Sequence, residues 1–241
     1  MRLESDATIL DFNPYEIRTE ADSTHNIAEK VVTSDRVFRY AKAGEALTAG
    51  YLAVQDTIAT EITMAVIAGA KGEKHIHFTN AANTTTAGDY DGGYAIVSYG
   101  TGIGQTYKIE RMAALTSGGT SVVYLDHPIV TALDTTSKLD LVKNLYMDVM
   151  MTATATLQPA GVPLVAVTAD NDYCWLQTRG ICGVYSDGTI AAGSGAENDG
   201  SAAGAVDVIV EADYVVNPLV GRAFWHPAAQ AYAHPIFLMI D

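Results

Sequence analysis

Short runs in which apolar and polar residues alternate recur along the chain from residue 36 onward. Residues 36–40 (RVFRY) and 105–109 (QTYKI) show this alternation, which places one face of a strand on a core and the other in water. Polar and glycine-containing segments separate the runs at intervals of about 8–12 residues, a spacing typical of a β-sandwich or barrel. The pattern predicts an all-β fold with strands at residues 36–40, 51–55, 62–67, 75–79, 94–99, 105–109, 122–125, 139–142, 164–167, 173–177, 181–185, 206–210 and 236–240.

The segments between these runs carry turn residues. Residues 91–93 (DGG), 117–119 (SGG) and 187–188 (DG) tolerate the positive φ that tight hairpins require. Residues 191–205 are almost all small or polar and predict a mobile surface loop. Helical patterns are confined to residues 41–47 and 144–151.

The first 35 residues differ from the rest of the chain. They are rich in charged and polar residues without a sustained period, which predicts an N-terminal arm that becomes ordered against a neighbouring subunit. The alternative is that this segment packs on its own domain as an extra edge strand. A β domain at residues 36–145 and a second β region at 146–241 follow, unless the two form one domain. The candidate anchors of the arm are Ile9, Leu10, Phe12, Tyr15 and Ile17.

Composition narrows the possible partners. The chain has 241 residues, 49% of them hydrophobic, so it can bury a sizeable core without metals or disulfides. Its 28 acidic residues against 14 Lys and Arg give a net charge of −14, which disfavours nucleic acid and anionic membranes as partners. The acidic start of the chain lacks the apolar core of a cleaved signal peptide, so synthesis in a cytoplasm is expected. The long uncharged stretch at residues 149–169 contains Pro159, Gly161 and Pro163 and is interpreted as strand, turn and strand.

Two sequence patterns are candidates for a metal site and a phosphate-binding site. His75 and His77 lie on one side of a predicted strand and could chelate a transition metal if a third ligand converged, as in a metal-dependent hydrolase. A lone pair of this kind is a weak signal, and two partly exposed histidines are the favoured interpretation. Residues 100–104 (GTGIG) are spaced like a phosphate-binding loop, but the following alternation predicts a wide hairpin instead. No catalytic, cofactor-binding or metal-binding residues are therefore predicted.

The cysteines and one tryptophan are assigned structural roles. Cys174 and Cys182 are too few for a disulfide framework and are expected to be reduced core thiols, although they could face each other across a hairpin at Arg179 and Gly180. Trp175 is expected to be buried among apolar strands.

Several stretches resemble structural proteins of tailed phages. They are residues 34–44 (SDRVFRYAKAG) with 47–50 (LTAG), 92–94 (GGY) with 100–109 (GTGIGQTYKI), and 163–167 (PLVAV) with 173–180 (YCWLQTRG). The last pair resembles the head-decoration, or cement, pattern in which an apolar strand, a polar link and a W-x-Q-x-x-G strand form part of a small β-barrel or β-tulip. The resemblance covers about two thirds of the chain, although compact decoration proteins are often about half as long.

This resemblance implies a role for the chain. It implies a non-enzymatic virion protein that stabilises the outside of the capsid, binds the major capsid protein and forms a homo-oligomer, commonly a trimer. The arm anchors would then contact the capsid or a neighbouring copy. A phage tail or fibre module that binds host glycan is the alternative, because Trp175, Trp225 and 13 tyrosines could supply aromatic platforms around a cleft.

Overall fold

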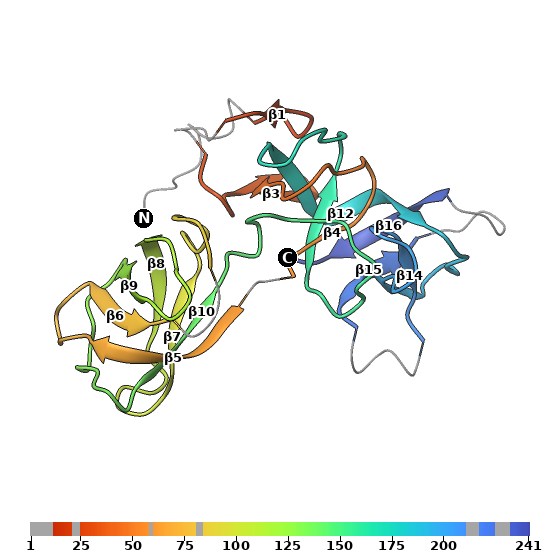
Figure 1. The fold of residues 1–241 in the computed structure, drawn as a ribbon. Helices are drawn as coiled ribbons and strands as arrows, with labels where there is room; N and C mark the ends of the chain where they lie inside the picture. Colours follow the sequence, from red (N-terminus) through yellow and green to blue (C-terminus); the bar gives the residue numbers. More distant parts are fainter. Residues whose placement is uncertain (1–11, 21–24, 58–59, 81–83, 211–216, 225–231) are drawn as a thin grey trace. The chain divides into compact units, whose positions relative to one another are not determined.

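The chain is built from strands in two compact units (Figure 1). The computed structural model describes residues 12–20, 25–57, 60–80, 84–210, 217–224 and 232–241, and none of these lies in a helix. The all-β prediction is therefore confirmed. One unit, here named the split unit, comprises Met1–Thr57 and Leu145–Asp241; the barrel unit is Ile58–Asn144. Nowhere in the described sequence is there a helix long and apolar enough to cross a membrane.

The division into units corrects the predicted domains. The upstream boundary of the barrel unit falls at residue 58 instead of 36, because strand β3 (Arg36–Lys42) pairs with strand β12 (Tyr173–Ser186) far along the chain. Tyr40, for example, is opposite Trp175 in this antiparallel ladder. The barrel unit is thus an insertion between two segments of the split unit.

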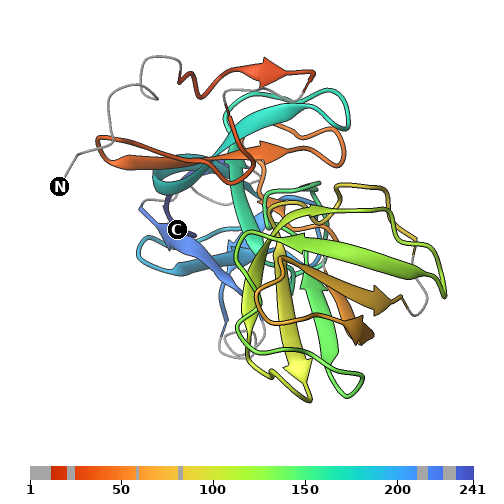
Figure 2. The same cartoon turned by 90° about the vertical axis from the view of Figure 1, so that its left-hand side faces the viewer.

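The barrel unit is a closed, all-antiparallel barrel in which the strands follow the order β10-β5-β6-β9-β8-β7 and β7 pairs with β10. Figure 2 shows these strands, coloured orange to green, wrapped around one another. Their burial alternates along each strand, as in β6, where Ile76 and Phe78 are buried between partly exposed neighbours. The strands are β5 (Thr60–Ala68), β6 (His75–Thr79), β7 (Tyr94–Tyr99), β8 (Thr106–Met112), β9 (Thr120–Leu125) and β10 (Lys138–Val142).

The glycine-rich segment at residues 100–104 is the hairpin loop between β7 and β8, as predicted. The amide of Val97 donates to the carbonyl of Gln105, and the amide of Gly104 donates to the carbonyl of Val97. Gly100 has a φ of 77°, and a Cβ at this position would lie 2.3 Å from the carbonyl oxygen of Thr136. Glycine is therefore required here by the backbone path of the loop.

The split unit is a ten-stranded sheet organised around β12. Its main path is β14-β13-β15-β16-β12-β11-β4, while β3 and β1 also pair with β12 and β2 pairs with β3. A single bridge between Ser186 and Val206 further joins β12 to β14. The remaining strands are β1 (Ile17–Arg18), β2 (Lys30–Thr33), β4 (Ala53–Val54), β11 (Pro159–Pro163), β13 (Gly195–Asn198), β14 (Val206–Val208), β15 (Leu219–Ala223) and β16 (Tyr232–Met239).

Strand β12 is continuous over residues 173–186, where the sequence predicted two separate strands at 173–177 and 181–185. Its first half pairs with β3 and its second half with β16, and the register against β3 shifts between Gln177 and Arg179. Gly180 has a φ of 90° at this irregularity. The glycine produces a bulge within one strand, so Cys174 and Cys182 do not face each other across a hairpin.

The N-terminal segment is part of the split unit where the structure describes it. Strand β1 pairs with β12, and strand β2 pairs with β3. The ring of Phe12 lies 5.0 Å from the rings of both Phe38 and Trp175, centroid to centroid. The prediction of an arm with little structure of its own is therefore wrong for residues 12–20 and 25–35, which pack on their own unit. The burial predicted for Trp175 is confirmed, with 1% of its surface exposed.

Three local predictions are also corrected. Residues 41–47 and 144–151 form strand, bridges and turns instead of helices. The predicted loop at 191–205 contains β13, whose Ala196, Glu197 and Asn198 are buried, because β13 pairs with β14 on one side and β15 on the other. The predicted strand at 164–167 lies after β11, and its Val167 makes only an isolated bridge to Leu47.

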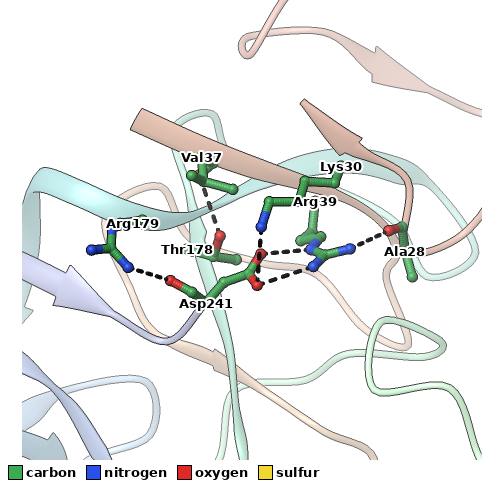
Figure 3. Close-up of polar contacts among 7 residues, drawn as sticks. All are labelled: Ala28, Lys30, Val37, Arg39, Thr178, Arg179 and Asp241. Carbon is green, nitrogen blue, oxygen red and sulfur yellow. Dashed lines mark hydrogen bonds and ion pairs between the residues drawn. The ribbon is translucent and has the colours of Figure 1, made fainter. Parts of the chain in front are cut away.

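A cluster of charged side chains connects three strands of the split unit near Asp241 (Figure 3). Arg39 donates hydrogen bonds to both carboxylate oxygens of Asp241, and Lys30 lies 3.4 Å from the same carboxylate. Arg179 donates to the main-chain carbonyl of Asp241 at 3.1 Å. Arg39 also donates to the carbonyl of Ala28. These contacts connect β2, β3 and β12 to the residues that follow β16.

Candidate binding surfaces

A groove of about 790 Å³ opens on the barrel unit. It lies between the β7–β8 hairpin, the turn between β5 and β6, and the segment after β9. Its walls combine aromatic, aliphatic and cationic side chains. The lining residues are Lys71, Gly72, Tyr94, Thr106, Tyr107, Lys108, Asp126, His127, Pro128, Ile129 and Val130.

The β7–β8 ladder places two of these side chains together. Tyr94 is opposite Lys108, and side chains at opposite positions of an antiparallel pair lie on the same face. Both are exposed, and the Nζ of Lys108 lies 5.6 Å from the centre of the Tyr94 ring. An aromatic face and a cation are therefore presented side by side along one wall.

Partly buried polar contacts hold the opposite wall in place. The Tyr107 hydroxyl donates to Oε1 of Gln105 at 2.6 Å and accepts a hydrogen bond from the amide of Val130 at 3.0 Å. The amide of Gly72 donates to the carbonyl of Ile129 at 2.8 Å. These contacts fix the segment of residues 126–130, so the groove is formed by the folded chain itself.

The charge of the groove contrasts with that of the chain. Lys71 and Lys108 bring two cations to the lining, whereas Asp126 brings one carboxylate. That carboxylate lies 2.7 Å from Nδ1 of His127. A chain with a net charge of −14 thus presents an excess of cations at this groove.

The split unit has an exposed apolar surface on β12 and β16, here named the apolar sheet face. Ile181 projects away from the buried Cys182 and is 47% exposed. It is opposite Phe237, which is in turn opposite Arg222 on β15. Met239 is exposed and is opposite Arg179. The apolar sheet face therefore consists of Ile181, Phe237 and Met239, flanked by Arg179 and Arg222.

Three aspartates gather elsewhere on the split unit. Carboxylate oxygens of Asp187, Asp199 and Asp207 lie within 4.8 Å of one another. Ser201 donates to Asp199 at 2.8 Å and contacts Asp187 at 3.3 Å. Desolvation, then the nearby Asp199 and Asp207 carboxylates, raise the pKa of Asp187. Carboxylates in such a group could ligate a hard cation such as Ca²⁺, although acidic side chains also gather without an ion.

The predicted arm anchors do not form one surface. Ile9 and Leu10 lie outside the described residues. Phe12 packs in the aromatic cluster of its own unit, and Ile17 lies in β1 opposite Cys174. Tyr15 is 59% exposed. Among the described anchors, Tyr15 is therefore the one most accessible to another molecule.

The histidine pair lies on β6, as the sequence predicted. The rings of His75 and His77 are 5.1 Å apart, and Nε2 of His75 lies 3.7 Å from Glu73. Within the described sequence, neither histidine belongs to a group of three side chains placed to hold a metal.

Both cysteines are free and buried, and burial raises the pKa of each thiol to about 12.

Sequence reasoning missed both the groove and the aspartate cluster. Lys71, Tyr94, Lys108 and His127 occupy separate strands and turns, and only the barrel closure brings them together. The hairpin predicted around residues 100–104 does bring the strands of Tyr94 and Lys108 together, but a loop of that length pairs Tyr94 with Glu110, and the observed register against Lys108 is shifted by two residues.

Comparison with known proteins gave no match: no family model, curated protein or solved structure is significantly similar to this chain.

Proposed function

We propose that the chain is a non-enzymatic structural protein of a tailed-phage virion that decorates and stabilises the capsid exterior. It binds the major capsid protein and associates with copies of itself, with a homotrimer as the favoured state. The sequence stretches that resemble head-decoration proteins support this proposal. In the fold they occupy β3 with the turn after it, the start of β7 with the β7–β8 loop and the first part of β8, and the segment after β11 with the first half of β12.

The observation that carries the proposal is the apolar sheet face. Contiguous apolar side chains on a soluble protein commonly mark a surface that another protein covers. Ile181, Phe237 and Met239 come from two neighbouring strands, so they form one continuous strip. The flanking Arg179 and Arg222 match the compositional trend of interfaces, in which arginine is enriched. We assign this face to the contact with the capsid or with another copy.

Two isoleucines of nearly equal exposure allow a matched test. Ile181 on the apolar sheet face is 47% exposed, and Ile67 on the barrel strand β5 is 46% exposed. Ile181→Asp should weaken co-sedimentation with capsids or reduce the oligomer measured by light scattering, whereas Ile67→Asp should leave both unchanged. Equal behaviour of the two variants would exclude this face from the contact. Cryo-electron microscopy of particles carrying the labelled protein would show whether it sits on the head or on the tail.

A further inference from the structure

We propose that the groove of the barrel unit is a docking site for a segment of a partner protein that carries a large apolar side chain beside carboxylates. This assignment goes beyond capsid attachment, since it concerns the barrel unit alone and a different surface from the apolar sheet face. It commits to the chemistry of the occupant: an acidic, apolar peptide segment.

The apolar part of the occupant follows from the lining. Tyr94, Pro128 and Val130 are exposed at the groove, and Ile129 and Tyr107 are buried behind it. An apolar side chain placed between Tyr94 and the segment at 128–130 would remove apolar surface from water on both sides. The hydrogen bonds that fix this segment mean that little ordering is needed when the occupant binds.

The acidic part follows from charge complementarity. Lys71 and Lys108 are exposed at the groove, and the one carboxylate of the lining, Asp126, already faces His127. Because the chain as a whole carries a net charge of −14, general attraction would not bring an anion here. The two lysines must therefore act at short range, on carboxylates placed next to the apolar side chain.

A saccharide fits the groove less well than a peptide. Sugars present hydroxyl groups that need many hydrogen-bonding partners, and most of this lining is apolar. Among its polar groups, Asp126 and His127 contact each other, and the Tyr107 hydroxyl is engaged by Gln105 and Val130. Thr106 and the two lysines remain as the main polar groups. The lining therefore favours a ligand with few polar atoms apart from its charges.

The probe for the test is a fluorescent hexapeptide of alternating glutamate and leucine, blocked at both ends. Its affinity for the full chain is measured by fluorescence anisotropy, at low and at high salt. Control peptides carry lysine or glutamine in place of glutamate, or alanine in place of leucine. We expect the glutamate–leucine peptide alone to bind, and its affinity to fall as salt is added.

Variants of the chain locate the binding. Lys108→Gln should weaken binding by about threefold, since an exposed ion pair contributes modestly, and Tyr94→Ala should weaken it further by removing the aromatic wall. Lys138→Gln, on β10 and outside the groove, is the matched control and should have no effect. Melting temperatures of the variants verify that each remains folded.

Charge reversal gives the decisive result. The double variant Lys71→Glu with Lys108→Glu should lose the glutamate–leucine peptide and gain affinity for the lysine–leucine peptide. Equal binding of all peptides, failure of the reversal, or binding of a uronic-acid oligosaccharide in preference to the peptide would overturn the proposal. Because capsid co-sedimentation of Ile181→Asp tests the apolar sheet face separately, failure of one proposal is distinguishable from failure of the other.

Discussion

The guanidinium of Arg39 donates two hydrogen bonds to the carboxylate of Asp241, from Nε at 2.7 Å and from Nη2 at 3.0 Å. Their side chains are about one-fifth exposed, at 22% and 19%. The planar, two-pronged arrangement is a strong form of ion pair because both hydrogen bonds are charge-assisted. Through it, the residues after β16 are attached to β3.

Breaking this pair should destabilise the split unit. Asp241→Asn and Arg39→Met should each lower the free energy of unfolding by about 1.5–3 kcal/mol, the range for hydrogen bonds to charged groups. The measurement is urea unfolding of both single variants and the double variant. The double variant should lose less than the sum of the two single losses, because both changes remove the same contact. Additive losses would show that the two residues are not coupled.

The same pair predicts a pH dependence. Its hydrogen bonds with Arg39 hold the pKa of Asp241 below the ordinary value of 3.8. A carboxylate with a lowered folded-state pKa stabilises the fold fully above its unfolded value, and this stabilisation is lost as the pH falls through the folded pKa. Between neutral pH and a pH below about 4, the free energy of unfolding should therefore fall less in the Asp241→Asn variant than in the unchanged chain. Glu110→Gln, an exposed change on β8, is the control and should leave the acid profile unchanged.

Two glycines of β12 should respond differently to the same substitution. Gly180 has a φ of 90°, and a Cβ there would lie 2.5 Å from the carbonyl oxygen of Asp35. Gly183 has no positive φ, and its Cβ would make an ordinary contact at 3.7 Å with Ala233. Gly180→Ala should cost about 1–3 kcal/mol or more through strain and clash, whereas Gly183→Ala should be nearly neutral. Thermal melting of the two variants checks the difference, and equal melting temperatures would contradict the bulge.

The N-terminal segment offers a second matched pair. Phe12 packs against Phe38 and Trp175, whereas Tyr15 is exposed. Phe12→Ala should lower the melting temperature, with a loss of about 1–3 kcal/mol for a partly buried aromatic, and Tyr15→Ala should not. If the segment instead serves only another subunit, Phe12→Ala would leave the melting of the free chain unchanged.

The cysteines should remain reduced and unreactive in the folded chain. Cys174 and Cys182 are eight positions apart on one extended strand, so their backbones are separated by about 25 Å, far beyond the span of a disulfide. Burial raises the pKa of each thiol to about 12, so thiolate is scarce at pH 8. A thiol reagent should label neither cysteine until denaturant is added and then label both. Rapid labelling of the native chain would show that the strands around β12 open readily.

The sequence predicted the barrel better than the split unit, for a physical reason. Residues 75–79 alternate between polar and apolar because one face lies on the barrel core, and residues 94–99 form a short run rich in β-branched and aromatic residues; both match strands to the residue. By contrast, β13 (GAEN) has no such alternation, since its successive residues Ala196, Glu197 and Asn198 are all buried and two of them are polar. Gly180 appeared to end a strand because a positive φ is commoner in turns than in bulges. The insertion of one unit in the other was not predictable, because the pairing of β3 with β12 has no local signature.

That insertion determines the order in which the chain can fold as it leaves the ribosome. All six barrel strands are complete once residue 142 has emerged, and each pairs only within the barrel. At that moment β3 has β2 beside it but still lacks β12, which is synthesised later. The barrel can thus close while one edge of the β2–β3 hairpin stays unpaired, and an unpaired strand edge is where nascent chains aggregate. Slow translation between residues 142 and 186 would lengthen that exposure, so the yield of soluble protein should depend on the codons used in this interval.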